Sequence, residues 1–330
     1  MSHPRLACLA AAAFGLGAAA TADAQTIRID GSSTVHPISL EAAQRFERRN
    51  GDADIEVDFS GTTAGFAAFC AGELEIADAS RPINAEELAT CAENEVAFIE
   101  LPIAMDAITI VVNGENDWAE SITVDELRLM WEPAAEGVIT TWNEVREDWP
   151  DEPLVLFGRG QDSGTYDYFT GAVVGAVRES RMDYEASEDI NFLVQGIAED
   201  PNALGFFGIG GYFANYEILR DVAVDNGDGP VHASLEAVQA GVYRPLTRPL
   251  FIYVNAAAAE ANPTLVAFVE FYLDSVSLWV AFTGYMPLED ASYVAALDQF
   301  EARRTGSAYD GVMRYDMTIS DILERHAVTQ

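Results

Sequence analysis

The chain has 330 residues and a formal charge of −36, from 54 acidic residues against 18 basic ones, every one of them arginine. So acidic a surface repels nucleic acid and anionic lipid at long range, which excludes both as partners. Hydrophobic residues make up 49% of the chain. That share, over this length, supplies two domains of ordinary size with their own cores and excludes a disordered protein.

The N-terminus has the pattern of an export signal. Arg5 supplies a positive charge, an apolar run covers residues 6–20, and a small-residue cleavage site ends at Ala24. We therefore expect residues 1–24 to be a cleaved signal peptide and the mature protein to be periplasmic or otherwise exported. A lipid anchor on Cys8 is the alternative, but Cys8 precedes almost the whole apolar run. No later segment approaches the ~18 uninterrupted apolar residues that a membrane span needs.

Two cysteines remain in the mature chain, Cys70 and Cys91. An even pair in an exported protein suggests a disulfide, and two buried free thiols are the alternative. Neither cysteine has the spacing partners of a zinc site, such as a second cysteine two residues away or a nearby histidine pair. We expect no metal and no cofactor.

One local plan occurs three times: a short strand, a turn rich in glycine and hydroxyl residues, and an amphipathic helix. The strands are expected at 26–30, 55–59 and 154–157, and the turns at 31–34, 60–63 and 158–165. A helix follows each turn, the first beginning at about Pro37. Strands that alternate with helices predict an α/β fold.

The rest of the chain fits the same class. Further strands are expected at 108–112, 203–208 and 249–254. A helix should open at Thr123, whose hydroxyl and a glutamate three residues on form the pattern of a capping box. A long helix is predicted over 263–282 from its apolar periodicity.

The three turns together predict an anion site. A helix start leaves about four backbone N–H groups unpaired and carries about half a positive charge. Hydroxyls add O–H donors, and glycines let the backbone approach closely. Arg159, beside the third turn, has a planar fork that can hold two oxygens of one tetrahedral anion. For any single turn a helix cap is the simpler explanation, but three in one chain favour a site.

Three motifs carry a resemblance to a known family. They are Asp30-Gly31-Ser32-Ser33-Thr34-Val35-His36-Pro37, the turn 60–66 followed by Glu75-Ile76-Ala77-Asp78-Ala79-Ser80-Arg81-Pro82, and Arg159-Gly160-Gln161-Asp162-Ser163-Gly164-Thr165. In order and spacing they resemble the PstS-type phosphate-binding proteins of ABC transporters, and the similarity, including 243–251, covers nearly the whole mature chain. It implies a type II periplasmic-binding-protein fold, with lobe 1 at 25–107 and 249–330, lobe 2 at 108–248, and a two-segment hinge beside a ligand cleft.

The resemblance also implies the ligand contacts. These are Ser33, Thr34 and the Val35 N–H from the first turn, Thr62 from the second, and Arg159, Ser163, Gly164 and Thr165 from the third. Ser80 stands where many family members have an aspartate, which accepts a hydrogen bond from protonated phosphate and rejects fully ionised sulfate. Serine accepts a hydrogen bond but lacks that charge. Arg81 is either a second cation on the ligand or half of a structural ion pair.

The function that follows is capture of inorganic phosphate by a monomer and its delivery to the membrane permease subunits of an ABC importer. Sulfate, arsenate or molybdate is the alternative ligand, and a phosphate sensor is another use of the same fold. A phosphatase with Ser163 as nucleophile is the enzymatic alternative. It needs a base, and no sequence context marks His36, His232 or His326 as one.

Overall fold

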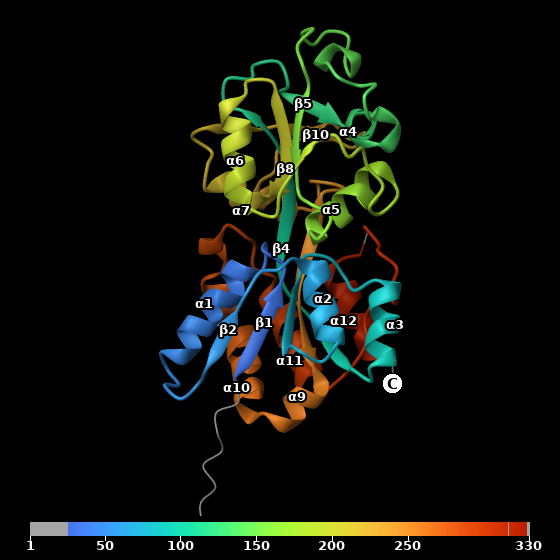
Figure 1. Ribbon diagram of the computed structural model, residues 1–330. Helices are drawn as coiled ribbons and strands as arrows, with labels where there is room; N and C mark the ends of the chain where they lie inside the picture. Colours follow the sequence, from blue (N-terminus) through green and yellow to red (C-terminus); the bar gives the residue numbers. More distant parts are fainter. Residues whose placement is uncertain (1–25, 316, 329–330) are drawn as a thin grey trace, which may run out of the picture.

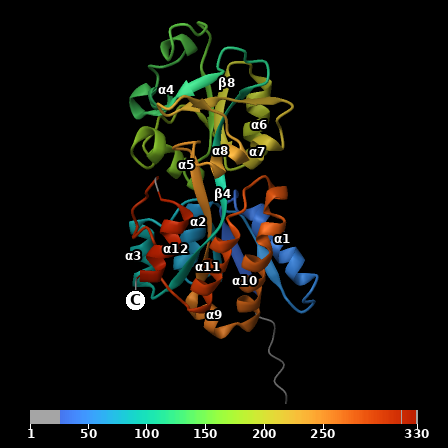
Figure 2. The ribbon, with the colours of Figure 1, turned by 180° about the vertical axis from the view of Figure 1, so that it is seen from behind.

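The computed structural model describes residues 26–315 and 317–328, so the predicted signal peptide at 1–24 lies outside the described residues. Two α/β lobes lie one above the other in Figure 1, and the view from behind in Figure 2 shows the same division. The strands β4 (Phe98–Asn113) and β12 (Thr247–Asn255) run between them. Among the described residues no helix is long and apolar enough to cross a membrane.

The lower lobe is a sheet with helices on its faces. Its strands follow the order β2-β1-β3-β12-β4, with β1 parallel to β2 and β3, and β12 antiparallel to β3 and β4. The further strands are β1 (Ile27–Gly31), β2 (Ile55–Val57) and β3 (Ile76–Ala79). The helices are α1 (His36–Glu47), α2 (Thr62–Cys70), α3 (Ala85–Glu93), α9 (Ala256–Ala261), α10 (Pro263–Ser275), α11 (Asp290–Glu301) and α12 (Ile319–Val328).

The upper lobe continues the same sheet through the second half of β4. β8 pairs antiparallel with β4, and β6 lies parallel between β8 and β7. The strands are β6 (Val155–Gly158), β7 (Glu185–Ala186), β8 (Ala203–Gly208) and β9 (Leu219–Asp221), with a small second sheet of β5 (Ser121–Thr123), β10 (Ala223–Asp225) and β11 (Pro230–Val231). The helices are α4 (Val124–Trp131), α5 (Gly164–Phe169), α6 (Ile190–Glu199), α7 (Ile209–Phe213) and α8 (Leu235–Gln239).

β4 changes partner between Ala107 and Ile108. Ala107 pairs with Thr247 of β12, whereas Ile108 pairs with Gly208 of β8. This change divides β4 into a first half that pairs with β12 and a second half that pairs with β8.

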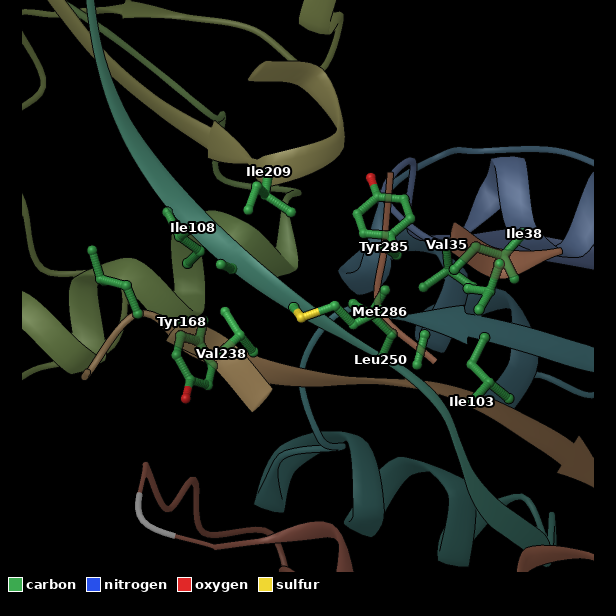
Figure 3. Close-up of a cluster of buried hydrophobic side chains, with 14 of the residues drawn as sticks. Val35, Ile38, Ile103, Ile108, Tyr168, Ile209, Val238, Leu250, Tyr285 and Met286 are labelled. Atoms are coloured by element: carbon green, nitrogen blue, oxygen red, sulfur yellow. The ribbon is translucent and has the colours of Figure 1, made fainter. Parts of the chain in front are cut away.

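Apolar side chains pack on both sides of this crossing. Figure 3 shows Ile38 and Ile103 toward one lobe and Ile108 and Ile209 toward the other, all fully buried in one continuous core. Because this core encloses the crossing strands, the two lobes share buried apolar surface where the chain passes between them.

The α/β class is confirmed, as are the three strand–turn–helix units at β1/α1, β2/α2 and β6/α5. The capping box is present as well: the Glu126 N–H donates to Thr123 Oγ1 at 3.1 Å, and the Thr123 N–H donates to Glu126 Oε2 at 2.8 Å. The strand expected at 108–112 is the second half of the longer β4.

The prediction of one helix over 263–282 is wrong, because α10 ends at Ser275 and only short 3₁₀ turns follow. Val276 and Val280 are both buried, and their spacing of four continues the helical periodicity beyond the end of α10. The Ser275 hydroxyl, however, donates to the Phe271 carbonyl at 2.6 Å. Such a local hydrogen bond to the backbone competes with the helical ladder.

The disulfide is confirmed, since Cys70 and Cys91 are bonded. It joins the last residue of α2 to α3. Because α2 begins at the second turn, the bond anchors the helix that follows that turn.

Candidate functional site

The three predicted turns meet between the lobes, where α5 lies above α2 in Figure 1. Gly164 is so close to the second turn that a Cβ atom there would lie 2.6 Å from Thr62 Oγ1 and 2.7 Å from Ser80 Oγ. A Cβ on Gly61 would lie 2.6 Å from the Asp162 carbonyl oxygen. Both contacts require glycine. We call the turns 31–35, 60–63 and 158–165 the three-turn cluster.

Arg159 belongs to the third turn of the three-turn cluster and is 1% exposed. Its Nη2 donates to the Ser33 hydroxyl of the first turn and to Glu188 Oε2 at 2.9 Å, and its Nε donates to Ser163 Oγ at 3.3 Å. Its Nη1 is buried and has no hydrogen-bond partner. One guanidinium therefore connects the first and third turns and retains unused N–H donors.

Burial shapes the charges here. Desolvation lowers the pKa of Arg159, while the nearby Glu188 carboxylate raises it. Arginine still stays protonated at any physiological pH. Desolvation also raises the pKa of Glu188, against the opposing effect of Arg159. The ionised form of Glu188 is therefore less stable here than it would be in water.

The serine hydroxyls next to Arg159 are oriented by their hydrogen bonds. Ser163 Oγ accepts from Arg159 Nε and from the Thr165 N–H at 3.1 Å, and Ser33 Oγ accepts from Arg159 Nη2. A hydroxyl that accepts in this way still has its own proton to donate. Both serines can therefore donate to an oxyanion.

The remaining predicted residues of the first two turns are buried, as is Ser80, which directly follows β3. Thr62 Oγ1 and Ser80 Oγ lie 3.2 Å apart, and the Ser80 N–H donates to Thr62 Oγ1 at 3.3 Å. Thr34 is buried, and its N–H donates to Ser32 Oγ at 3.2 Å. The Val35 N–H, expected to reach a ligand, donates to the Ser32 carbonyl at 3.0 Å.

Arg81 uses every N–H of its guanidinium inside the protein. Nε donates to Asp167 at 2.6 Å; Nη1 donates to Glu87 at 2.8 Å and to the Pro82 carbonyl at 3.1 Å; Nη2 donates to Glu87 at 2.7 Å and to Thr63 Oγ1 at 3.0 Å. Of the two roles weighed from the sequence, this arrangement favours the structural ion pair.

The structure adds residues that sequence reasoning missed. Arg248 is fully buried, pairs with Asp106 at 2.7 Å, and donates to Thr165 Oγ1 of the third turn at 2.7 Å. Arg248 lies in the 243–251 segment that contributes to the family resemblance, but no sequence pattern there marked it as a site residue. Glu188 is 29 residues beyond Arg159 in an acidic stretch, so no pattern singled it out.

Comparison with known proteins gives the family. A family model described as a PBP superfamily domain matches residues 17–276. The chain belongs to this superfamily. It is 48% identical to Protein SphX of Synechocystis sp. over 303 residues, which are 92% of this chain and 90% of the relative. It is 31% identical to the Phosphate-binding protein PstS of Staphylococcus aureus, over 83% of this chain and 81% of the relative.

Solved structures agree with this PBP-superfamily assignment. A possible phosphate binding protein from Planctomyces limnophilus is 37% identical with a TM-score of 0.62, covering 85% of this chain and 97% of that one. A putative phosphate ABC transporter substrate-binding protein from Clostridium perfringens, solved with bound phosphate, is 25% identical with a TM-score of 0.67, covering 80% and 100%. The PstS-type resemblance noted in the sequence is confirmed, and with it the predicted type II periplasmic-binding-protein fold.

This PBP-superfamily member does not pair Ser163 with a histidine among the residues whose side chains are described. The Ser163 hydroxyl is held by Arg159 and Thr165. The His36 ring packs 4.8 Å from that of Phe59, and His232 Nδ1 lies 2.9 Å from Asp221. The side chain of His326 lies outside the described set. Within residues 26–315 and 317–328, no cluster of three or more histidine, cysteine or acidic residues could hold a metal ion.

Proposed function

We propose that this chain is an exported substrate-binding protein that captures inorganic phosphate and delivers it to the permease subunits of an ABC importer. The observation that carries the proposal is the buried Arg159. Its Nη1 has no partner in the protein, and the Ser33 and Ser163 hydroxyls that it holds keep their protons for a ligand. A tetrahedral oxyanion with several acceptor oxygens matches such a set of donors. The named functions of the relatives support phosphate among the oxyanions.

The proposed contacts follow the geometry. The cluster of donors comprises Ser33, Thr34, Thr62, Ser80, Arg159, Ser163, Gly164 and Thr165. The Val35 N–H and Arg81 are the weakest members of the predicted set, because each already donates within the protein. Binding through hydroxyls and one cation reconciles an anion ligand with a strongly acidic surface, since surface charges more than about 8–10 Å away are screened at physiological salt.

Capture works by lobe closure in this proposal. Lobe 1 comprises 25–107 and 249–330, lobe 2 comprises 108–248, and the hinge lies where β4 and β12 cross. Arg159 of lobe 2 donates to Ser33 of lobe 1, so a ligand held by both residues favours the closed arrangement. We expect a monomer that has no catalytic activity, since one pair of lobes completes the site and no base contacts Ser163 among the described side chains.

Calorimetric titration of the mature chain with phosphate and with sulfate, each at two pH values, tests the ligand. We expect tight binding of phosphate and much weaker binding of sulfate. Sulfate binding as tight as phosphate would show that the ligand assignment is wrong. A chain that binds no tetrahedral oxyanion would contradict the function itself. Incubation with a chromogenic phosphate ester tests the absence of catalysis, and turnover that Ser163→Ala abolishes would overturn it.

A further inference from the structure

Arg248 is a second buried arginine at the three-turn cluster. It is on β12, 0% exposed, and pairs with Asp106, its register partner on β4, through Nε at 3.1 Å and Nη2 at 2.7 Å. The same Nη2 donates to Thr165 Oγ1 at 2.7 Å. A guanidinium from one of the two strands that cross between the lobes therefore contacts the third turn.

The two arginines share one peculiarity. Arg248 Nη1, like Arg159 Nη1, is buried and has no hydrogen-bond partner. A buried N–H group left without an acceptor destabilises a protein by about 1–3 kcal/mol, and by more when the group is charged. Two such groups on two guanidiniums are unusual, because buried polar groups are ordinarily paired.

One short segment holds both guanidiniums. Arg159 Nε donates to Ser163 Oγ, the Thr165 N–H donates to the same oxygen, and Arg248 Nη2 donates to Thr165 Oγ1. The two cations also repel each other, since the charge of Arg248 lowers the pKa of Arg159. They therefore flank Ser163 and Thr165 closely enough that one small ligand can meet both.

Charge balance points the same way. Each arginine is offset by one carboxylate: Arg159 by Glu188 at 2.9 Å and Arg248 by Asp106 at 2.7 Å. Neither carboxylate reaches the Nη1 of its arginine, so both guanidiniums keep a buried donor for an anion between them. The hydroxyl of Thr165 accepts from Arg248, so its proton is free to point at the same anion.

We propose that Arg248 is a second cation of the oxyanion site: its Nη1 binds the ligand beside Arg159, and its Nη2 turns the Thr165 hydroxyl into a donor. The inference rests on the proposed function and names a contact beyond it. Because Arg248 and Asp106 are partners on the two crossing strands, the bound anion and Asp106 share one guanidinium. The charge of the ligand therefore interacts directly with a residue pair at the hinge.

Two variants test the proposal by phosphate titration. Asp106→Asn keeps Arg248 but removes its competing carboxylate, and we expect phosphate to bind several-fold more tightly. The double variant Asp106→Asn/Arg248→Gln removes the cation without leaving a buried charge, and we expect a loss of about 100-fold in affinity, the scale for a buried charge contact. The double variant Arg181→Gln/Asp183→Asn is the matched control. It removes another buried arginine's carboxylate pair and should leave affinity unchanged.

The outcomes separate the two claims. A wild-type chain that binds no oxyanion contradicts the proposed function. If the wild type binds sulfate instead of phosphate, the same variants are titrated with sulfate. A folded Asp106→Asn/Arg248→Gln protein with affinity within about twofold of wild type overturns the role of Arg248 alone. If that variant fails to fold, Asp106→Asn decides: tighter binding supports a ligand-facing cation, whereas weaker or equal binding with an unchanged unfolding midpoint means that the pair is structural.

Discussion

Arg159 and Glu188 form an ion pair inside the three-turn cluster, with Nη2 and Oε2 2.9 Å apart. A bound oxyanion and the Glu188 carboxylate therefore compete for one guanidinium. We expect Glu188→Gln to bind sulfate several-fold more tightly than the wild type, because the amide keeps the size of the side chain and removes the repulsion. Glu185→Gln, on the exposed β7, is the control and should change nothing.

The same pair predicts a pH dependence. Burial raises the pKa of Glu188 above its ordinary value, so the carboxylate takes up a proton as the pH falls toward that raised pKa. The charge of sulfate stays constant over this range. Sulfate affinity of the wild type should therefore rise as the pH is lowered from about 8 to about 5, whereas Glu188→Gln should show a shallower rise, left by the buried Asp106, whose pKa burial also raises. Parallel profiles in the two proteins would contradict this role for Glu188.

Arg159→Ala should weaken phosphate binding by about 2–5 kcal/mol, the usual effect of removing one partner of a buried charged contact. The phosphate affinity of Arg159→Lys should lie between those of the wild type and Arg159→Ala, because an ammonium keeps the charge but loses the planar fork. Isothermal titration measures both. Arg45→Ala, which removes a partly exposed pair with Glu41, should bind like the wild type. Unchanged affinity in Arg159→Ala would exclude the three-turn cluster as the site.

Asp167 of the upper lobe forms an ion pair with Arg81 of the lower lobe. It is buried on α5, and it accepts from Arg81 at 2.6 Å and from Arg178 at 2.9 Å. We expect Asp167→Asn to weaken phosphate binding by about 1–3 kcal/mol through a less favourable closed state, since truncating a buried ion pair leaves charge unpaired. The loss should appear as faster dissociation in stopped-flow measurements. Asp183→Asn, which removes an ion pair within the upper lobe, is the control.

How much of this site the sequence reveals depends on the range of each interaction. The three turns are local features: glycine and hydroxyl residues before a helix can be recognised from adjacent positions, and all three occur as predicted. The pairing of Arg248 with Asp106 spans 142 residues, and only the antiparallel register of β12 and β4 creates it. The role of Arg81 also depends on contacts that the local sequence does not show. Its position beside Ser80 allowed a ligand contact, but its guanidinium donates to Asp167 and Glu87.

The disulfide should stabilise the fold without shaping the site. Cys70 and Cys91 are 21 residues apart, and closing a loop of that length contributes about 3 kcal/mol in the chain-entropy model. We expect the Cys70→Ser/Cys91→Ser variant to lose about that much free energy of unfolding in urea titrations. Phosphate affinity of the folded variant should stay unchanged, because neither cysteine belongs to the three turns. A large loss of affinity would mean that the bond positions α2 for binding.

Asp78 predicts how stability changes with pH. It is fully buried on β3, its Oδ1 accepts from the Ser39 hydroxyl at 2.8 Å, and its Oδ2 has no partner. Burial raises its pKa well above the ordinary value, so the folded chain holds a proton that the unfolded chain releases near pH 4. The stability from this group is fully present below that pH and is lost as the pH rises through the raised folded pKa.

Asp78→Asn removes this dependence because the amide does not titrate. Between the unfolded and folded pKa values the wild type should lose about 1.4 kcal/mol of stability per pH unit relative to the variant. Urea unfolding of both proteins across that range measures the difference, and Asp58→Asn, at an exposed position, should run parallel to the wild type. A constant difference between Asp78→Asn and wild type at every pH would mean that Asp78 is ionised in the fold, with a partner on Oδ2.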